Sequence, residues 1–159
     1  MSFKAILTLG DQTFNLIECT SALTQNVDKK GRPVSGVSAG RIRMIVEGTD
    51  EDTIPRWATD KLKKMDGKIT FYKIWEQDSK FKEIEFKGAY VTNFVESFFG
   101  DEEPEMYDED ALEYANETLQ RENKRLTSLH KLLNMSYLFM LWVSAEKLKI
   151  DGIEHSNNW

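Results

Sequence analysis

Apolar and polar residues alternate along much of the chain, which is typical of β-strands that bury one face. Residues 3–9 and 13–19 alternate in this way, and Gly10-Asp11-Gln12 lies between them. Glycine and aspartate are common turn residues, so this stretch predicts a β-hairpin. Residues 21–27 predict a further extended segment.

A long loop is predicted from Asp28 to Gly40, because this stretch has several glycines, a proline and no apolar period. Alternation returns in residues 41–47, where Ile42, Met44 and Val46 share one face. The other face of this strand carries mostly charged residues, and we expect it to contact water.

A short helix is predicted to begin at Asp52 or Thr53, since either residue can cap a helix and Pro55 suits the first turn. Its apolar residues recur at helical spacing, so we expect the helix to plug the β-structure with one face. The residues expected on that face are Trp57, Ala58 and Leu62.

Further strands are predicted over residues 68–75, 82–86 and 89–98, and the β-like pattern returns over residues 136–150. The chain is therefore predicted to be mainly β, a single domain over residues 1–159. Its expected architecture is a small β-barrel or sandwich of antiparallel strands with one short helix.

A long helix interrupts this β pattern. Residues 111–133 lack glycine and proline and predict about six helical turns, roughly 34 Å long. Residues 100–134 are therefore predicted to be a helical insertion between two strands. The leucines that repeat along the helix, with one more between them, are Leu112, Leu119, Leu126, Leu129 and Leu133.

This leucine stripe has three interpretations, which the sequence leaves open. It can pack on its own barrel, form a coiled coil with a neighbouring chain, or offer an apolar surface to another protein. In the last two cases it is a candidate partner or cargo helix.

The charge of the chain is concentrated in one segment. The formal net charge is −6 over 159 residues, and the seven acidic residues within 101–110 leave the rest of the chain at +1. A near-neutral body argues against a dedicated nucleic-acid binder, which normally has a basic face. The acidic segment is expected to be a solvated loop, with recognition of a basic partner as the alternative.

No apolar run is long enough to span a membrane; the longest candidate is Tyr137 to Ala145. The first residues lack the zones of a secretory signal, so we expect any export to take another route. Cys19 is the single cysteine and cannot form an internal disulfide, so stability must come from packing and assembly.

The sequence offers little for catalysis, cofactors or metals. Residues 31–36 have the glycine spacing of a phosphate loop, but Val37-Ser38 replaces its lysine and hydroxyl residue. Cys19 is expected to be a small buried side chain, and neither His130 nor His155 has a partner at zinc-ligand spacing. Ligand stacking remains an alternative to core packing for Trp57, Trp75, Trp142 and Trp159.

Several sequence segments resemble one known family. They are SFKAILTLGDQTFNLIEC, QNVD, GRPVSG and AGRI within residues 1–50, then DGKITFYK, FKGAYVTNFVESF, SAEKL and the closing EHSNNW. In order and position they resemble the tube protein of type VI secretion systems in its Bacteroidetes form, the haemolysin-coregulated protein (Hcp/TssD) family. Two departures stand out: Ser38-Ala39, where relatives often have a basic residue and glycine, and residues 100–134, where relatives typically have a short turn.

The resemblance implies a structural role without a reaction. Such proteins are small β-barrels that form hexameric rings, and the rings stack into the inner tube of a contractile injection machine. The implied partners are further copies of the chain and the sheath, spike and effector proteins. The implied location is the bacterial cytoplasm, with export by the type VI machine and without a signal peptide. The loop implied to contact the next ring contains Asp28, Lys29, Lys30, Gly31, Arg32 and Pro33.

Two other classes of function compete with this one. A free-standing barrel could bind a ligand, or act as a small enzyme, near Trp75 or Trp142. An acidic adaptor could dimerise through the leucine stripe, in which case it should be sensitive to Leu119→Lys.

Overall fold

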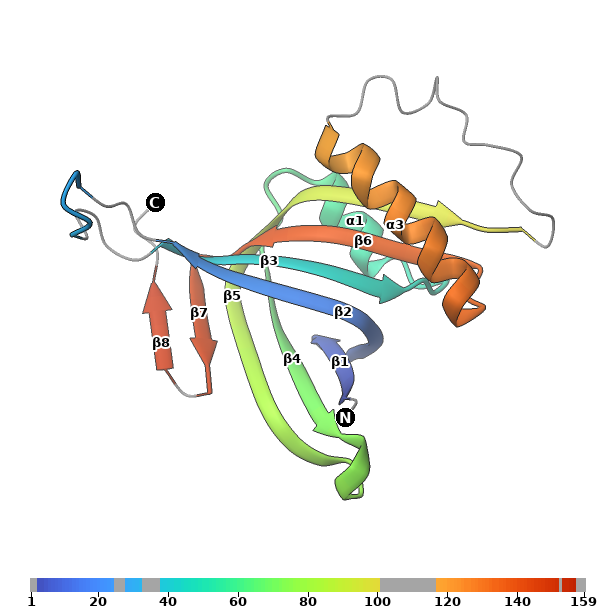
Figure 1. Ribbon diagram of the computed structural model, residues 1–159, viewed down its shortest axis with the longest axis horizontal. Coiled ribbons are helices and arrows are strands. Elements are labelled where there is room, and N and C mark those ends of the chain that lie inside the picture. The colour runs from blue at the N-terminus through green and yellow to red at the C-terminus, as the bar shows by residue number, and fades with distance from the viewer. Residues whose placement is uncertain (1–2, 25–27, 33–37, 101–116, 152, 157–159) are drawn as a thin grey trace.

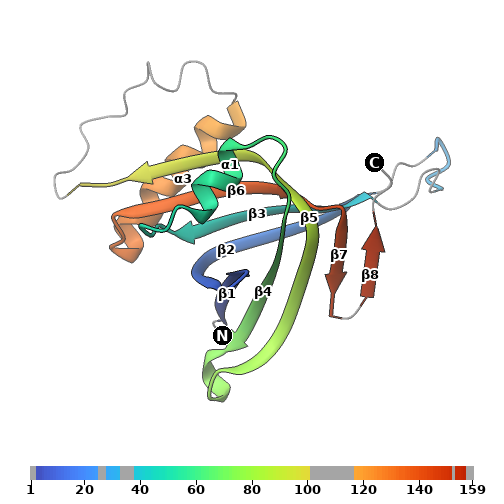
Figure 2. The same cartoon turned by 180° about the vertical axis from the view of Figure 1, so that it is seen from behind.

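The computed structural model describes residues 3–24, 28–32, 38–100, 117–151 and 153–156. Antiparallel strands form one sheet whose order is β4-β1-β2-β3-β6-β5-β7-β8, and an additional β4–β5 pairing closes the first six strands into a barrel (Figures 1 and 2). The predicted mainly β fold is therefore confirmed. The strand bounds are β1 (Phe3–Leu9), β2 (Gln12–Thr24), β3 (Ser38–Glu47), β4 (Met65–Lys73), β5 (Ser79–Phe98), β6 (Tyr137–Ser144), β7 (Lys147–Ile150) and β8 (Ile153–Ser156).

The first hairpin forms as predicted. Leu9 pairs with Gln12, so Gly10 and Asp11 make the turn, and Gly10 has a φ of +63° that favours glycine. The predicted loop of residues 28–40 ends three residues too late, because β3 already begins at Ser38. Ser38 pairs with Thr24 because the extended β2 offers a free backbone edge, which needs no apolar period in its partner.

One continuous strand, β5, replaces the two that were predicted over residues 82–86 and 89–98. Its first half pairs with β4 and its second half with β6, and Gly88, with a φ of +61°, lies near the change of partner. The strand predicted over residues 68–75 is also corrected. Ile74 and Trp75 leave β4 and form a short 3-10 helix, η1 (Ile74–Glu76).

Helix α1 (Thr53–Thr59) plugs the barrel, as predicted. Ile54 and Trp57 are fully buried, and the Trp57 indole Nε1–H donates to the Ala89 carbonyl at 2.9 Å. Two details were wrong. Asp52 precedes the helix but makes no side-chain cap, and Leu62 lies beyond the helix end and is 76% exposed.

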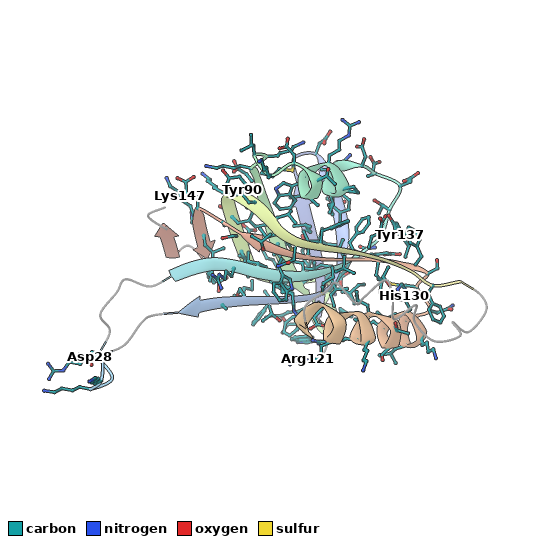
Figure 3. All side chains as sticks on the ribbon, turned by 90° about the horizontal axis from the view of Figure 1, so that it is seen from above. Asp28, Tyr90, Arg121, His130, Tyr137 and Lys147 are labelled. Atoms are coloured by element: carbon teal, nitrogen blue, oxygen red, sulfur yellow. The ribbon has the colours of Figure 1, made fainter. Side chains whose placement is uncertain are left out.

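Helix α3 (Glu117–Leu133) lies on the outer face of the barrel, over β3, β5 and β6, on the side of these strands opposite α1 (Figures 1 and 3). The predicted start at residue 111 falls outside the described residues. The outer face of β3 was predicted to contact water, but the helix covers part of it. Ile45 on that face is fully buried under Leu126 of the helix.

Candidate functional site

The loop predicted to contact a neighbouring ring extends away from the barrel at the ends of β2 and β3 (Figure 3). The Asp28 carboxylate holds it together, because Oδ1 accepts from the backbone N–H groups of Lys30 at 2.8 Å and Arg32 at 2.9 Å. Two backbone hydrogen bonds add to these. The Asp28 N–H donates to the Arg32 carbonyl at 2.8 Å, and the Gly31 N–H donates to the Asp28 carbonyl at 3.0 Å. The chain thus builds a compact turn without help from the barrel.

The turn presents positive charge to solvent. Lys29, Lys30 and Arg32 are exposed, and Gly31 has a φ of +79°, a conformation that glycine adopts without strain. Pro33, the last residue of the predicted contact loop, lies outside the described residues. The arrangement can bind carboxylates on a facing surface through its three cations.

The leucine stripe of α3 is only partly turned toward the barrel. Leu126 is fully buried with Ile45, Leu138 and Met140 in a small cluster separate from the main core, and Leu129 packs against its margin. Leu133 is 37% exposed. Leu112 and the side chain of Leu119 lie outside what the structure describes. At Leu126 the interpretation of packing on the protein's own barrel is therefore the correct one.

Polar contacts also hold α3 to the barrel. The Glu18 carboxylate accepts a hydrogen bond from Arg43 of β3 at 2.6 Å and another from Arg125 of the helix. Because one carboxylate serves two guanidinium groups, Glu18 joins β2, β3 and α3 at one point. No sequence motif predicts this contact, since the three residues are far apart along the chain.

His130 fixes the C-terminal end of α3 and is only 2% exposed. Its Nδ1 lies 2.6 Å from the Met135 carbonyl, and its Nε2 lies 2.9 Å from the Ser97 hydroxyl. A carbonyl only accepts, so Nδ1–H donates to it and neutral Nε2 can accept from Ser97. The ring also stacks on Phe99 at 5.5 Å. His130 is thus a structural histidine.

The other sequence candidates for chemistry do not converge. Burial raises the pKa of the Cys19 thiol to about 11, so the thiolate needed for a nucleophile is scarce near neutral pH. Within the described residues, no group of three or more metal-ligating side chains comes together. His155 belongs to β8, and its side chain is outside the described set.

The tryptophans have different surroundings. Trp57 is in the barrel core, and Trp75 is 44% exposed and packs against Phe3 outside it. Trp142 lines a groove on the outer face of the sheet. Trp159 lies outside the described residues. Side chains therefore fill the barrel where a ligand-binding barrel would hold its ligand, and this alternative function is not favoured.

Comparisons with known proteins agree with this architecture. The sequence profile of the family described as Hemolysin coregulated protein Hcp (TssD) matches residues 1–123. Hcp1 from Flavobacterium johnsoniae has a TM-score of 0.70 at 22% identity, over 97% of this chain and 99% of that chain. Hcp1 from E. coli EAEC 042 has a TM-score of 0.58 at 12% identity, over 100% and 99%. No curated protein sequence matches the chain.

These findings first define a class, a closed β-barrel with the fold of type VI tube proteins. Since the family profile covers most of its length, the chain belongs to the haemolysin-coregulated protein (TssD) family. It is a tube subunit of a type VI secretion system, in a family of structural proteins that these systems secrete. No helix within the described residues is long and apolar enough to cross a membrane.

Proposed function

We propose that copies of this chain close into hexameric rings and that the rings stack into the inner tube of the secretion machine. The observation that carries this proposal is the family match over residues 1–123. The strand order supports it, because it ends at β8, an edge that a neighbouring subunit can cover. Bacterial cytoplasm is the proposed site of synthesis, with export through the machine.

The loop of residues 28–33 is the proposed stacking element. Its cations extend from the barrel along the direction of β2 and β3, where a second ring can meet them (Figure 3). Exposed ion pairs each contribute about 1 kcal/mol or less and are screened by salt. A ring repeats the contact in every subunit, so many weak contacts act together.

Residues 100–134 are proposed to be an insertion into a single domain of residues 1–159. The strands on either side of it already meet: Phe98 pairs with Tyr137, and the Phe99 N–H donates to the Ser136 carbonyl at 2.8 Å. A short turn could therefore join β5 to β6 directly. The added helix is proposed to contact an accessory partner, either cargo inside the ring or the sheath outside it.

The first experiment is the solution mass of the purified protein by light scattering, with negative-stain images of the same sample. We expect a mass of six subunits and annular particles. A dimer would favour an adaptor built on the leucine stripe. A monomer that persists at high protein concentration would contradict the ring.

A further inference from the structure

The outer side of α3 and the uncovered part of the sheet beside it form one basic surface, called here the basic face. Arg121 lies on α3 in Figure 3, on the outer side of the barrel. The helix has four basic and two acidic residues over 117–133. The exposed cations of the basic face are Arg41, Arg121, Lys124, Arg125 and Lys131.

A groove of about 480 Å³ runs along this face beside the helix. Arg41 and Arg43 line it with Trp142, Thr20 and Asn93. The indole Nε1 of Trp142 is buried and has no hydrogen-bond partner among the described residues. A buried N–H without an acceptor is costly, so a ligand that brings an oxygen to this indole would be favoured.

The groove and the helix belong to the same surface because they share Glu18. This carboxylate contacts Arg43, whose side chain is 18% exposed, and Arg125, whose side chain is 48% exposed. The exposed Arg41, Arg121, Lys124 and Lys131 add further positive charge to the basic face.

The same chain contains a segment of matching chemistry. Residues 101–110 read DEEPEMYDED and carry seven carboxylates around Met106 and Tyr107. Carboxylates suit the arginines and the indole N–H, while Met106 and Tyr107 suit the Trp142 ring that lines the groove.

We propose that the basic face of one subunit binds the acidic segment, residues 101–110, of a second copy of this chain. The proposal rests on the proposed function, because that function places copies of the chain next to one another. A surface and a complementary segment that lie on one chain form a head-to-tail contact, and such contacts build rings and filaments. The contact would be steered by charge and weakened by salt.

Charge reversal tests this contact between copies. The first variant carries Arg41→Glu and Lys124→Glu, and the second carries Glu102→Lys and Glu103→Lys. Each variant by itself places charges of the same sign on both sides of the contact, which then repel. We expect each to raise the protein concentration needed for half-maximal assembly about tenfold in sedimentation at low salt. Mixed in equal amounts, the two variants should assemble again, because each then meets an oppositely charged surface.

The matched control is Lys61→Glu with Lys63→Glu, which reverses two exposed lysines away from the basic face and should assemble like the wild type. Circular dichroism and thermal unfolding should show that every variant is folded. Unchanged assembly of the first variant, or loss that mixing does not restore, would overturn the inference. Failure of the wild-type protein to form rings would instead contradict the proposed function.

Discussion

A single carboxylate, that of Asp28, organises the loop proposed for stacking. It accepts two backbone N–H groups, at 2.8 and 2.9 Å, in a segment that is exposed throughout. Without it these amides would turn to water and the loop would sample more conformations. The cations would then reach a neighbouring ring in fewer productive arrangements.

Asp28→Ala should therefore weaken ring stacking and leave ring formation unchanged. Removal of the two hydrogen bonds should cost about 1 to 3 kcal/mol of loop order. Sedimentation of stacked against single rings measures the effect. Asp28→Asn is the control because it keeps an acceptor oxygen, and equal stacking by both variants would contradict the role of the carboxyl group.

Ionisation of the Cys19 thiol should make the stability of the folded protein depend on pH in the alkaline range. Burial, opposed by Arg43 and aided by Glu18, raises the pKa of this thiol from 9.0 to about 11. The unfolded chain releases the thiol proton near pH 9, whereas the folded protein keeps it until about pH 11. The folded state thus binds more protons in this window, and its stability falls as pH rises from 9 toward 11.

Between pH 8 and pH 10.5, the wild-type protein should lose roughly 1 to 2 kcal/mol more free energy of unfolding than Cys19→Ala. Urea unfolding of both proteins at the two pH values provides the comparison. Tyr137, whose pKa burial and Glu96 raise to about 12, is present in both proteins, so its contribution cancels. Parallel losses in the two proteins would show that the thiol is not the cause.

At the scale of elements, α3 is attached to the barrel by a small contact. Among the described residues, its apolar cluster centres on Leu126 and is separate from the main core, and Glu18, Ser97 and Phe99 add polar and stacking contacts. Most of the stability of a helix in a protein comes from packing of its apolar face. The attachment of α3 therefore depends strongly on one leucine.

Leu126→Ala should loosen α3 while the barrel stays folded. Truncation of a buried leucine costs about 2 to 5 kcal/mol, and here the loss falls on the docking of one helix. Hydrogen exchange should speed up in residues 117–133 and stay slow in β1 to β6. Leu132→Ala is the control because Leu132 is 80% exposed and should change neither.

At the scale of the whole molecule, strands β1 to β6 close the barrel without residues 100–134. Since β5 and β6 already pair up to Phe98 and Tyr137, a protein in which a short Asn-Gly turn replaces residues 100–134 should fold and form rings. Its unfolding should remain a single transition. Because it lacks the acidic segment, it should need a higher protein concentration to assemble, but at saturating concentration its mass by light scattering should be that of the complete ring. A monomeric product there would contradict an accessory role for residues 100–134.

The deletion also uncovers Ile45 and Met140, which α3 buries completely. The deletion variant should therefore carry Ile45→Thr and Met140→Thr, so that exposed apolar surface does not cause aggregation. The same two substitutions in the full-length chain form the matched control, since they should only loosen the helix.

Local pattern was enough to predict several elements. Alternation and turn residues located the β1–β2 hairpin, and helical spacing after Pro55 placed Trp57 in the core. The ends of the strands were predicted less accurately, because backbone pairing with neighbouring strands decides where a strand ends. Ser38 joins β3 only through its partner Thr24, and β5 continues past Gly88 because β4 and β6 each pair with part of it.

The sequence by itself determined the class of protein: mainly β structure, a long helix between two strands, an acidic segment and the segments that resemble the tube family. These features depend on neighbouring residues and on composition, which a linear pattern records. Only the tertiary structure decided which face α3 covers, that Glu18 joins Arg43 to Arg125, and that Arg43 and Trp142 line one groove. These contacts depend on strands distant in sequence becoming neighbours, and closure of the barrel brings those strands together.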